Sequence, residues 1–511
     1  MTAHKITITV HDRWVVWLAS ALAVAAIVAA GWFLVLRSGV LRAQSAMNCS
    51  GQYLVDVTLP AGSRWEMCWE VRNSEGIIFH DIYYTPAGGE PRRLVLGQAN
   101  LAQIHVPYDD NGARFHDVSD FGLGGPSMDD LTQADCPDGT LLVDAGKHVL
   151  CMQIGPRGYA YKYFAQELQG SALSLFSVSH VGQYNYVPLW RFVDNGAIEP
   201  TIGATGKLQR LNYNSASVGW PVHVEGGGQV YAIAHAHNYF WRLDFDIDGP
   251  LNDQVEEFEF TPIDNNYSYQ VSVTPFMTEA ARTVNPTRMR SWRVRDTVTT
   301  NTDGHAISYH LDPLRTGHIH QGPAIEPFTN NQFYVTVNKP CERFASHNPE
   351  VQCAADVSKY VNGESLVGQD IVLWYGITFH HLPRDEDEGM VDAHWDGFQL
   401  TPRDWTATNP LDNVVLGPPA TPTATSPDTP VPPTSTSTST SVPTPTYTAT
   451  VPAVALPTES YTPTPTNTAT AAPTNTPVTQ TPTPIGGVGG TPAPPGIGNL
   501  AHPLFLPQIT R

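Results

Sequence analysis

The most informative stretch of the chain is Ser179-His-Val-Gly-Gln-Tyr-Asn-Tyr-Val187, which continues through an apolar run to Val193. Asp194-Asn-Gly196 follows, and Ala197-Ile-Glu199 leads away from it. An Asx–Gly pair between two apolar runs is a strong signal for a β-hairpin. The stretch therefore predicts two antiparallel strands, with Tyr184 in the first. A tyrosine in such a strand is usually a core residue, so any chemistry at Tyr184 depends on other parts of the chain.

The charge and cysteine content narrow the class of protein. The 511 residues include 48 acidic and 28 basic side chains, for a formal net charge of −20, which disfavours nucleic acid as a partner. An even number of cysteines at short spacing, downstream of an export segment, predicts disulfides in an oxidising compartment. No Cys-x-x-Cys pair is present, so a zinc ribbon is disfavoured. The cysteines form three local couples: Cys49 and Cys68, Cys136 and Cys151, Cys341 and Cys353.

Changes in composition predict a chain of four parts. Residues 14–36 are uncharged and long enough to span a bilayer as a helix, which favours an uncleaved signal anchor over a cleaved signal peptide. The third part is rich in Thr and Pro and predicts a disordered, extended stalk. We expect the body to be extracytoplasmic, either membrane-anchored or secreted to the cell surface. The parts are the anchor or signal peptide (1–44), the globular body (45–412), the Thr/Pro-rich linker (413–486) and a Gly-rich link with a short apolar tail (487–511).

Strand signals dominate the globular body. Ser268-Tyr-Gln-Val-Ser-Val and Gln332-Phe-Tyr-Val-Thr-Val alternate in the manner of half-buried strands, and turn residues separate such runs closely. Residues 278–282 are the exception, where we expect a short turn of helix. The pattern predicts a mainly β fold, a large antiparallel β-sandwich.

Histidines are placed where they could ligate a metal ion. His235 and His237 stand two apart in a strand-like context, which puts both imidazoles on one face. A third ligand from a distant strand would complete a copper or zinc site, and the residues alone leave the choice of histidines open. The candidate segments are Ala234-His-Ala-His237, His318-Ile-His320 and His380-His381.

Two acidic stretches could also carry chemistry. Asp244, Asp246 and Asp248 alternate with apolar residues and would share one strand face, which predicts either a calcium-like site or a solvated edge strand. Asp117 lies in the apolar, Gly-bearing run Phe115–Gly124. A desolvated aspartate there has a raised pKa and could act as a general base; capping a turn is the alternative role.

Taken in order, these segments resemble the catalytic domain of the copper-containing amine oxidases, the topaquinone (TPQ) enzymes, over roughly residues 50 to 410. The family's cofactor motif, Asn-Tyr-Asp/Glu-Tyr, corresponds to Gln183-Tyr-Asn-Tyr186. The resemblance implies that Tyr184 is the TPQ precursor, flanked by Gln183 and Asn185. It also implies a copper site at His235, His237 and His381, because the family's aromatic run and Arg-Leu-Asp follow the first His-x-His pair only.

The resemblance implies further roles. Asp117 corresponds to the catalytic base, Tyr108 to the tyrosine that hydrogen-bonds the cofactor oxygen, and Phe115 to a gate. Cys136 and Cys151 correspond to a family disulfide. The residues implied for a structural calcium ion are Asp244, Phe245 through its carbonyl, Asp246, Asp370, and Ile371 through its carbonyl.

Two functions follow from the resemblance. The first is oxidative deamination of primary amines by dioxygen, giving aldehyde, ammonia and hydrogen peroxide, in a homodimer with β-hairpin arms. The second is a catalytically impaired, copper-binding surface module, favoured by two departures from the family pattern, Gln183 and Asn185. His180 is a further departure, where the family usually has Thr or Ser. A cupin-like site built on His318 and His320 is a weaker third possibility.

Overall fold

The computed structural model describes most of the predicted globular body. The predicted N-terminal span and C-terminal tail lie outside the described residues, as does nearly all of the linker. No helix among the described residues is long and apolar enough to cross a membrane. The chain divides into two units, 1–424 and 425–511, and every described residue belongs to the first. The described residues are 47–49, 51–110, 112–209, 219–224, 228–264, 267–314, 317–412 and 414.

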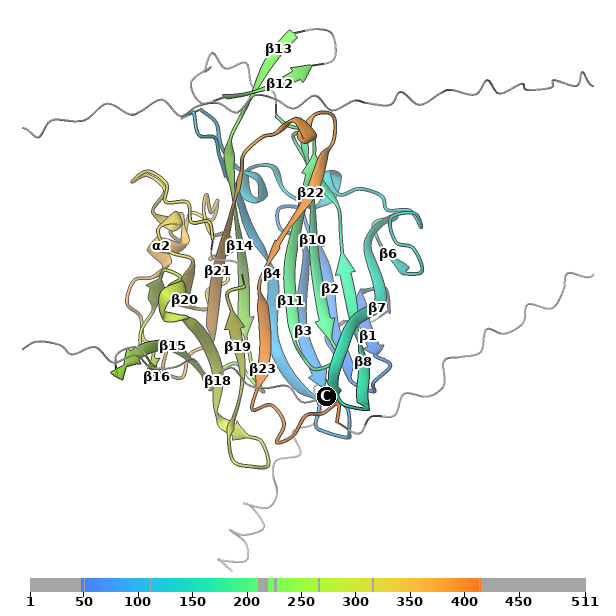
Figure 1. Ribbon diagram of the computed structural model, residues 1–511, viewed down its shortest axis with the longest axis vertical. Helices are drawn as coiled ribbons and strands as arrows, with labels where there is room; N and C mark the ends of the chain where they lie inside the picture. Colours follow the sequence, from blue (N-terminus) through green and yellow to red (C-terminus); the bar gives the residue numbers. More distant parts are fainter. Residues whose placement is uncertain are drawn as a thin grey trace, which may run out of the picture. The chain divides into compact units, whose positions relative to one another are not determined.

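Antiparallel strands build almost the whole described body (Figure 1). Within the described residues, the first sheet has nine strands and the second has twelve. The first sheet, in spatial order, consists of β1 (Leu54–Thr58), β2 (Arg64–Arg72), β3 (Gly76–Thr85), β4 (Arg93–Pro107), β14 (His235–Phe245), β21 (Ile371–His381), β20 (Phe333–Val337) and β17 (Ala280–Arg282), with β5 (Arg114–His116) beside β4.

The second sheet consists of β16 (Ser268–Pro275), β15 (Asp253–Ile263), β18 (Ser291–Thr300), β19 (Ala306–Asp312), β23 (Gln399–Arg403), β11 (Ile198–Gly206), β10 (Tyr184–Val193), β8 (Gln166–Phe176), β7 (Lys147–Tyr163) and β6 (Thr140–Asp144), with β22 (Val391–Gly397) beside β11 and β9 (Ser179–Val181) beside β10. A separate hairpin joins β12 (Gly219–Val224) to β13 (Gly228–Ile233). The helical elements are short: α2 (Val357–Tyr360), the π-helical turn η2 (Asp117–Phe121), and the 3₁₀ turns η1 (Gly51–Tyr53), η3 (Gly125–Ser127), η5 (Pro286–Arg288), η6 (Pro327–Thr329) and η7 (Asp385–Asp387).

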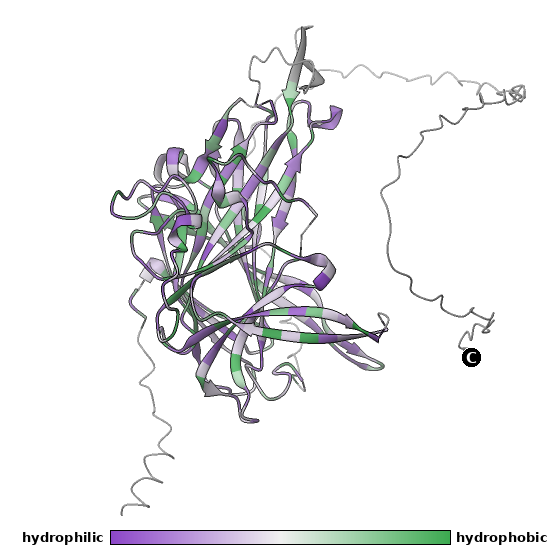
Figure 2. Cartoon of the chain, turned by 90° about the vertical axis from the view of Figure 1, so that its left-hand side faces the viewer, coloured by the Kyte–Doolittle hydropathy of each residue, from purple (hydrophilic) through white to green (hydrophobic). Residues whose placement is uncertain are grey.

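The two large sheets pack face to face through aromatic side chains. Trp65 of β2 meets Phe192 of β10 with ring centroids 5.1 Å apart, and Trp292 of β18 stacks on Phe333 of β20 at 4.2 Å. Both contacts belong to one large buried core. Hydropathy alternates along many strands, as the bands in Figure 2 show, because one side of each strand faces this core. The predicted mainly β sandwich is therefore confirmed.

The predicted hairpin is present. Strands β10 and β11 pair from Tyr184 opposite Gly206 to Phe192 opposite Ile198. Gly196 in the turn has φ +91°, and a Cβ there would lie 2.6 Å from the Tyr84 ring, so the turn needs glycine. The predicted helical turn at 278–282 is wrong. Residues 280–282 form β17, because β20 offers them backbone hydrogen bonds at the edge of the first sheet.

The predicted cysteine couples are also present. Cys49 bonds Cys68, Cys136 bonds Cys151, and Cys341 bonds Cys353. Each bridge closes a loop of no more than about twenty residues, so each constrains local chain geometry.

Candidate metal centre and active site

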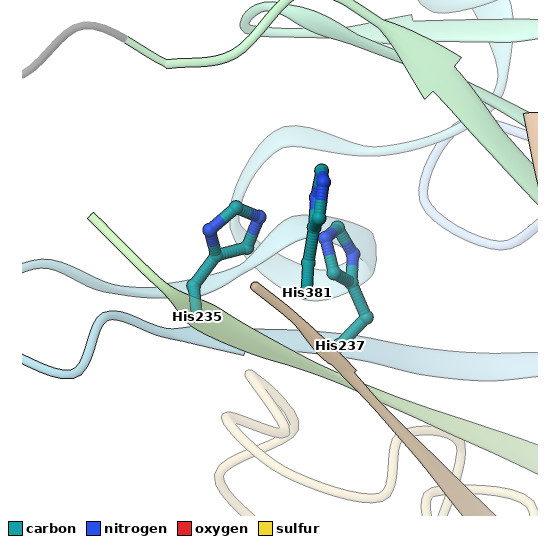
Figure 3. Close-up of side chains that lie close together, drawn as sticks. All are labelled: His235, His237 and His381. Atoms are coloured by element: carbon teal, nitrogen blue, oxygen red, sulfur yellow. The ribbon is translucent and has the colours of Figure 1, made fainter. Parts of the chain in front are cut away.

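Three buried histidines meet at one end of the first sheet. The β14–β21 register places His235 directly opposite His381, and His237 lies two residues further along β14 on the same face. Ring centroids of His235 lie 4.9 Å from His237 and 5.0 Å from His381. One nitrogen from each ring lies within 4.8 Å of the others. Figure 3 shows the three imidazoles rising from the two strands toward one space.

The protonation pattern of these histidines suits a metal ion. Both ring nitrogens of His237 are buried and have no hydrogen-bond partner. His235 donates from Nδ1 to the Ile233 carbonyl at 2.9 Å, which leaves Nε2 unprotonated. Burial lowers the pKa of His235 to about 3 and holds the pKa of His237 well below its usual value. Neutral imidazoles are the form that copper and zinc bind, so the cluster fits either metal.

Tyr184 reaches this cluster from the second sheet. Its hydroxyl lies 3.0 Å from Nε2 of His235 and 3.2 Å from Nδ1 of His381. The side chain is only 4 % exposed, and burial raises its pKa well above the usual value for tyrosine. The phenol is therefore neutral and held at the nitrogens that face the candidate metal position.

Asp117 contacts Tyr186, whose ring stacks on that of Tyr184 with centroids 6.1 Å apart. It begins η2, is 6 % exposed, and accepts a hydrogen bond of 2.7 Å at Oδ2 from the Tyr186 hydroxyl. Burial raises the pKa of Asp117 to about 7, although the Tyr186 bond opposes that shift. The burial expected for this carboxyl is present. Such a carboxyl can gain or lose a proton near neutral pH.

A cavity of about 230 Å³ joins these groups. Its lining includes Tyr108, Phe115, Asp117, Gln183, Tyr184 and Tyr186. The ring of Tyr108 stacks on His235 at 4.6 Å and meets the Phe115 ring edge-on at 6.1 Å. The structure therefore brings together the residues that the family resemblance implied for base, precursor, gate and copper site.

The sequence did not lead us to three further residues that contribute to the site. Asp387 accepts a hydrogen bond of 2.9 Å from Nε2 of His381 and so turns Nδ1 toward Tyr184. Tyr186 binds Asp117, and Phe121 lines the cavity while 58 % exposed. The period of two that puts Tyr186 on the face of Tyr184 was a usable signal. No sequence signal pointed to Asp387 or Phe121, because their roles depend on side chains distant in sequence.

The other His-x-His pair does not join the triad. Nδ1 of His318 accepts a hydrogen bond of 3.1 Å from the backbone N–H of His380, and the His380 side chain points away from the triad to Asp109. The ring of His320 lies 6.4 Å from that of His105. These contacts do not support a cupin-like site on His318 and His320.

In a second histidine cluster, an arginine already neutralises the carboxylate. His105, His116 and Glu326 lie close enough to share a metal ion. However, Arg114 donates two hydrogen bonds to Glu326, and His105 contacts the same carboxylate at 3.2 Å. A guanidinium in that position repels a metal cation, so the cluster is better described as a buried ion pair with its polar neighbours.

Three carboxylates gather at the other end of β14 and β21. Asp244, Asp246 and Asp370 lie within ligand distance of one another, and each has a buried Oδ1 without a hydrogen-bond partner. Phe245 pairs with Ile371, which places the backbone of these two residues beside the cluster. Burial and mutual repulsion raise the pKa of Asp246 to about 7 and that of Asp244 well above its usual value. Such a donor set fits a hard cation.

Asp248 does not share that face, contrary to the sequence pattern. Strand β14 ends at Phe245, and Asp248 has φ +54°. Its carboxylate accepts a hydrogen bond of 3.0 Å from Thr299. The strict alternation on which the prediction relied therefore stops before this residue.

Comparison with known proteins identifies the family of this chain. The sequence profile described as copper amine oxidase, enzyme domain, matches residues 62–418. A primary amine oxidase of Arthrobacter sp. (strain P1) is 25% identical over 398 residues, covering 69% of this chain and 58% of that protein. A diamine oxidase [copper-containing] 1, peroxisomal, of Nicotiana tabacum is 26% identical over 389 residues, covering 66% and 48%. The crystal structure of a copper-containing benzylamine oxidase from Hansenula polymorpha has a TM-score of 0.58 at 19% identity, covering 73% of this chain and 65% of that chain.

The chain belongs to the copper amine oxidase family. The profile covers most of the chain, and the resemblance found in the sequence is confirmed. The chain spans about half the length of these two curated relatives. The names of the relatives differ in their amine, so membership leaves the substrate open.

Proposed function

We propose that this protein is a copper- and TPQ-dependent oxidase of primary amines. The observation that carries the proposal is the position of Tyr184, whose hydroxyl contacts two of the three clustered imidazoles while its ring lines the cavity that holds Asp117. In the balanced reaction, one amine, one dioxygen and one water give one aldehyde, one ammonia and one hydrogen peroxide. The amine carbon loses two electrons and dioxygen gains them.

The protein's own groups have separable roles in this proposal. Copper held by His235, His237 and His381 would supply the oxygen chemistry that converts Tyr184 to the quinone, and the quinone would accept the electrons of the amine. Asp117 takes the proton from the amine carbon, since a carboxylate of raised pKa is an effective base near neutral pH. Tyr186 fixes the direction of the carboxylate.

The surrounding aromatic groups prepare the cavity. Tyr108 would hydrogen-bond the cofactor oxygen, which its place on the cavity wall against His235 supports. Phe115 lies at the same wall and would act as the gate that keeps bulk water from the reacting carbon.

Two departures from the family motif compensate each other. His180 and Asn185 are cross-strand partners in β9 and β10, and the imidazole donates from Nδ1 to the Asn185 carbonyl oxygen at 3.0 Å. The Asn185 amide donates in turn to Asp129 at 3.2 Å. Gln183 is exposed at the cavity mouth. A coupled and satisfied pair supports a working site over an impaired copper-binding module, in which the motif would be free to decay.

The test is reconstitution of the metal-free protein with copper in air. We expect one copper per chain, a visible quinone band that phenylhydrazine traps, and oxidation of a primary amine such as benzylamine. Aldehyde, ammonia and hydrogen peroxide should form in equal amounts. Copper binding without a band or products would favour the copper-binding surface module instead.

We also propose that Asp244, Asp246 and Asp370, with the carbonyls of Phe245 and Ile371, bind calcium. Their unpartnered oxygens and raised pKa values support cation binding by this cluster. Calcium at about 100 times its Kd should stabilise the copper-free protein by about 2.7 kcal/mol, or about 3–4 °C in Tm for a body of this size. Calorimetry with and without calcium measures this shift.

A matched pair of variants makes the calcium test specific. Asp246→Asn should remove the calcium-dependent rise in Tm, because one of the three carboxylates is lost. Asp248→Asn should keep the rise, because Asp248 lies outside the cluster. An equal response of the two variants would contradict the assignment.

We propose that the body lies outside the cytoplasm, anchored to the membrane by residues 14–36 or secreted to the cell surface. The three disulfides support an oxidising compartment. A homodimer is part of the same proposal, supported by the exposed apolar side chains along the β15–β16 hairpin, among them Tyr267 and Val273. Sedimentation of the isolated body would test the dimer.

A further inference from the structure

The cavity beside Tyr184 has an uneven distribution of charge. Among the described lining residues, Asp117 carries the only ionisable carboxylate, and no lysine or arginine is present. The apolar wall of the cavity consists of Val106, Phe115, Phe121 and Val181. The remaining described lining side chains are neutral tyrosines and glutamines, with one glycine. Among the described lining residues, the one carboxylate is therefore that of the proposed base.

The aromatic part of this wall is ordered by edge contacts. Phe115 meets Tyr108 at 6.1 Å with an interplanar angle of 90°. It also meets Phe121 at 6.1 Å with an angle of 62°. Such a chain of rings presents flat apolar surface to a ligand and offers it no hydrogen-bond acceptor except the tyrosine hydroxyl. The cavity volume of about 230 Å³ is below the range usual for drug-sized ligands and suits a small molecule.

We propose that the substrates are small monoamines with an apolar or aromatic tail, and that aliphatic diamines are rejected. This inference rests on the proposed function. When the reacting amino group lies at Tyr184 and its carbon at Asp117, the tail of the substrate lies against Phe115, Phe121 and Val181. A second ammonium group held beside Phe115 and Val181 meets apolar side chains and, among the described lining residues, no second carboxylate. An unpaired charge in such surroundings is disfavoured.

The net charge of the whole protein favours diamines, whereas the cavity disfavours them. The two effects must therefore be measured separately. A net charge of −20 attracts a divalent diamine more than a monovalent amine during encounter. That attraction is largely screened at physiological ionic strength, where the Debye length is about 8 Å. The selectivity of the cavity is therefore measured at that ionic strength.

The sharpest comparison is n-pentylamine against 1,4-diaminobutane. The two have the same number of heavy atoms, and a terminal methyl in one replaces the second ammonium of the other. For the copper-loaded full chain, we expect kcat/KM for pentylamine to exceed that for the diamine by about 100-fold or more. Benzylamine should be oxidised at least as well as pentylamine. Equal values, or a preference for the diamine, would overturn the inference.

A variant that adds a carboxylate to the cavity tests where the tail of the substrate lies. Phe121→Glu places a carboxylate at the cavity mouth, and the site tolerates charge because Phe121 is 58 % exposed. We expect the preference for pentylamine to fall to tenfold or less. Phe164→Glu is the matched control, since Phe164 is 81 % exposed in the β7–β8 turn and does not line the cavity. An unchanged preference in Phe121→Glu, or an equal change in both variants, would overturn the inference.

A binding measurement separates this inference from the proposed function. In the copper-free, unprocessed protein, saturation-transfer NMR should detect bound pentylamine and benzylamine but not 1,4-diaminobutane, with Phe121→Glu restoring the diamine signal. If the copper-loaded protein forms no hydrazine-reactive quinone, the proposed function fails while this binding preference still stands. If the quinone forms and the diamine binds as well as pentylamine, the inference fails alone.

Discussion

Replacing Tyr184 by phenylalanine should abolish amine oxidation and leave copper bound. The hydroxyl contacts His235 and His381 but is not needed to build the imidazole cluster, whose geometry comes from the pairing of β14 with β21. Loss of the hydroxyl removes about 1 kcal/mol of hydrogen bonding, so the variant should fold. Without the phenol oxygen at the copper position, the ring has no route to a quinone.

Three measurements decide this prediction. Metal analysis should find copper at the wild-type ratio in Tyr184→Phe, phenylhydrazine should give no coloured adduct, and peroxide release should fall to background. Tyr163→Phe, at an exposed position on the β7 end, is the control and should match the wild type in all three. A coloured adduct in Tyr184→Phe would place the quinone on another residue and remove the central assignment.

Local sequence was sufficient where short-range geometry determines structure. The Asp194–Gly196 turn needs glycine at a positive φ, and the two apolar runs beside it can only pair in one direction. The same reasoning identified His235 and His237 as a pair on one face. It failed at residues 280–282, since three residues at a sheet edge take their conformation from the neighbouring strand.

The third histidine shows what local patterns could not supply. His381 lies opposite His235 only because β14 is flanked by β4 and β21, a strand order formed by segments far apart in sequence. His318 has the same His-x-His spacing as His235, and the two could be separated only by resemblance to a family. Asp387 and Tyr186 act on other side chains, so their roles appear only once the tertiary contacts are known.

Replacing Asp117 by asparagine should reduce kcat/KM by about 10³-fold or more while leaving the quinone in place. The amide keeps the shape of the side chain and can still accept the hydrogen bond from Tyr186, but it cannot take a proton from the amine carbon. Phenylhydrazine should therefore titrate the variant as fully as the wild type. Asp120→Asn is the control, because Asp120 is an exposed carboxylate in the same short turn that binds His347. It should retain activity within about twofold.

The raised pKa of Asp117 adds a pH dependence to this prediction. Its ionised form is the base, so wild-type kcat/KM should rise with pH through about 7. Stability should change in the other direction. Between the unfolded pKa of about 4 and the folded value of about 7, the native state holds a proton that the unfolded state has lost, so the free energy of unfolding decreases as pH rises across that window.

The pH dependence of the stability difference between the wild type and Asp117→Asn distinguishes a base from a merely structural carboxyl. At pH 8 the wild type carries the full cost of ionising a buried group, at most about 4 kcal/mol for a shift of this size, and Asp117→Asn does not. We therefore expect the inactive variant to be more stable than the wild type at pH 8 and to keep less than half of that advantage at pH 5, as measured by denaturant unfolding. An Asp117→Asn protein that still oxidises amines at the wild-type rate would show that the proton leaves through another group. A variant that is inactive and also less stable at both pH values would reassign Asp117 to holding η2 in place.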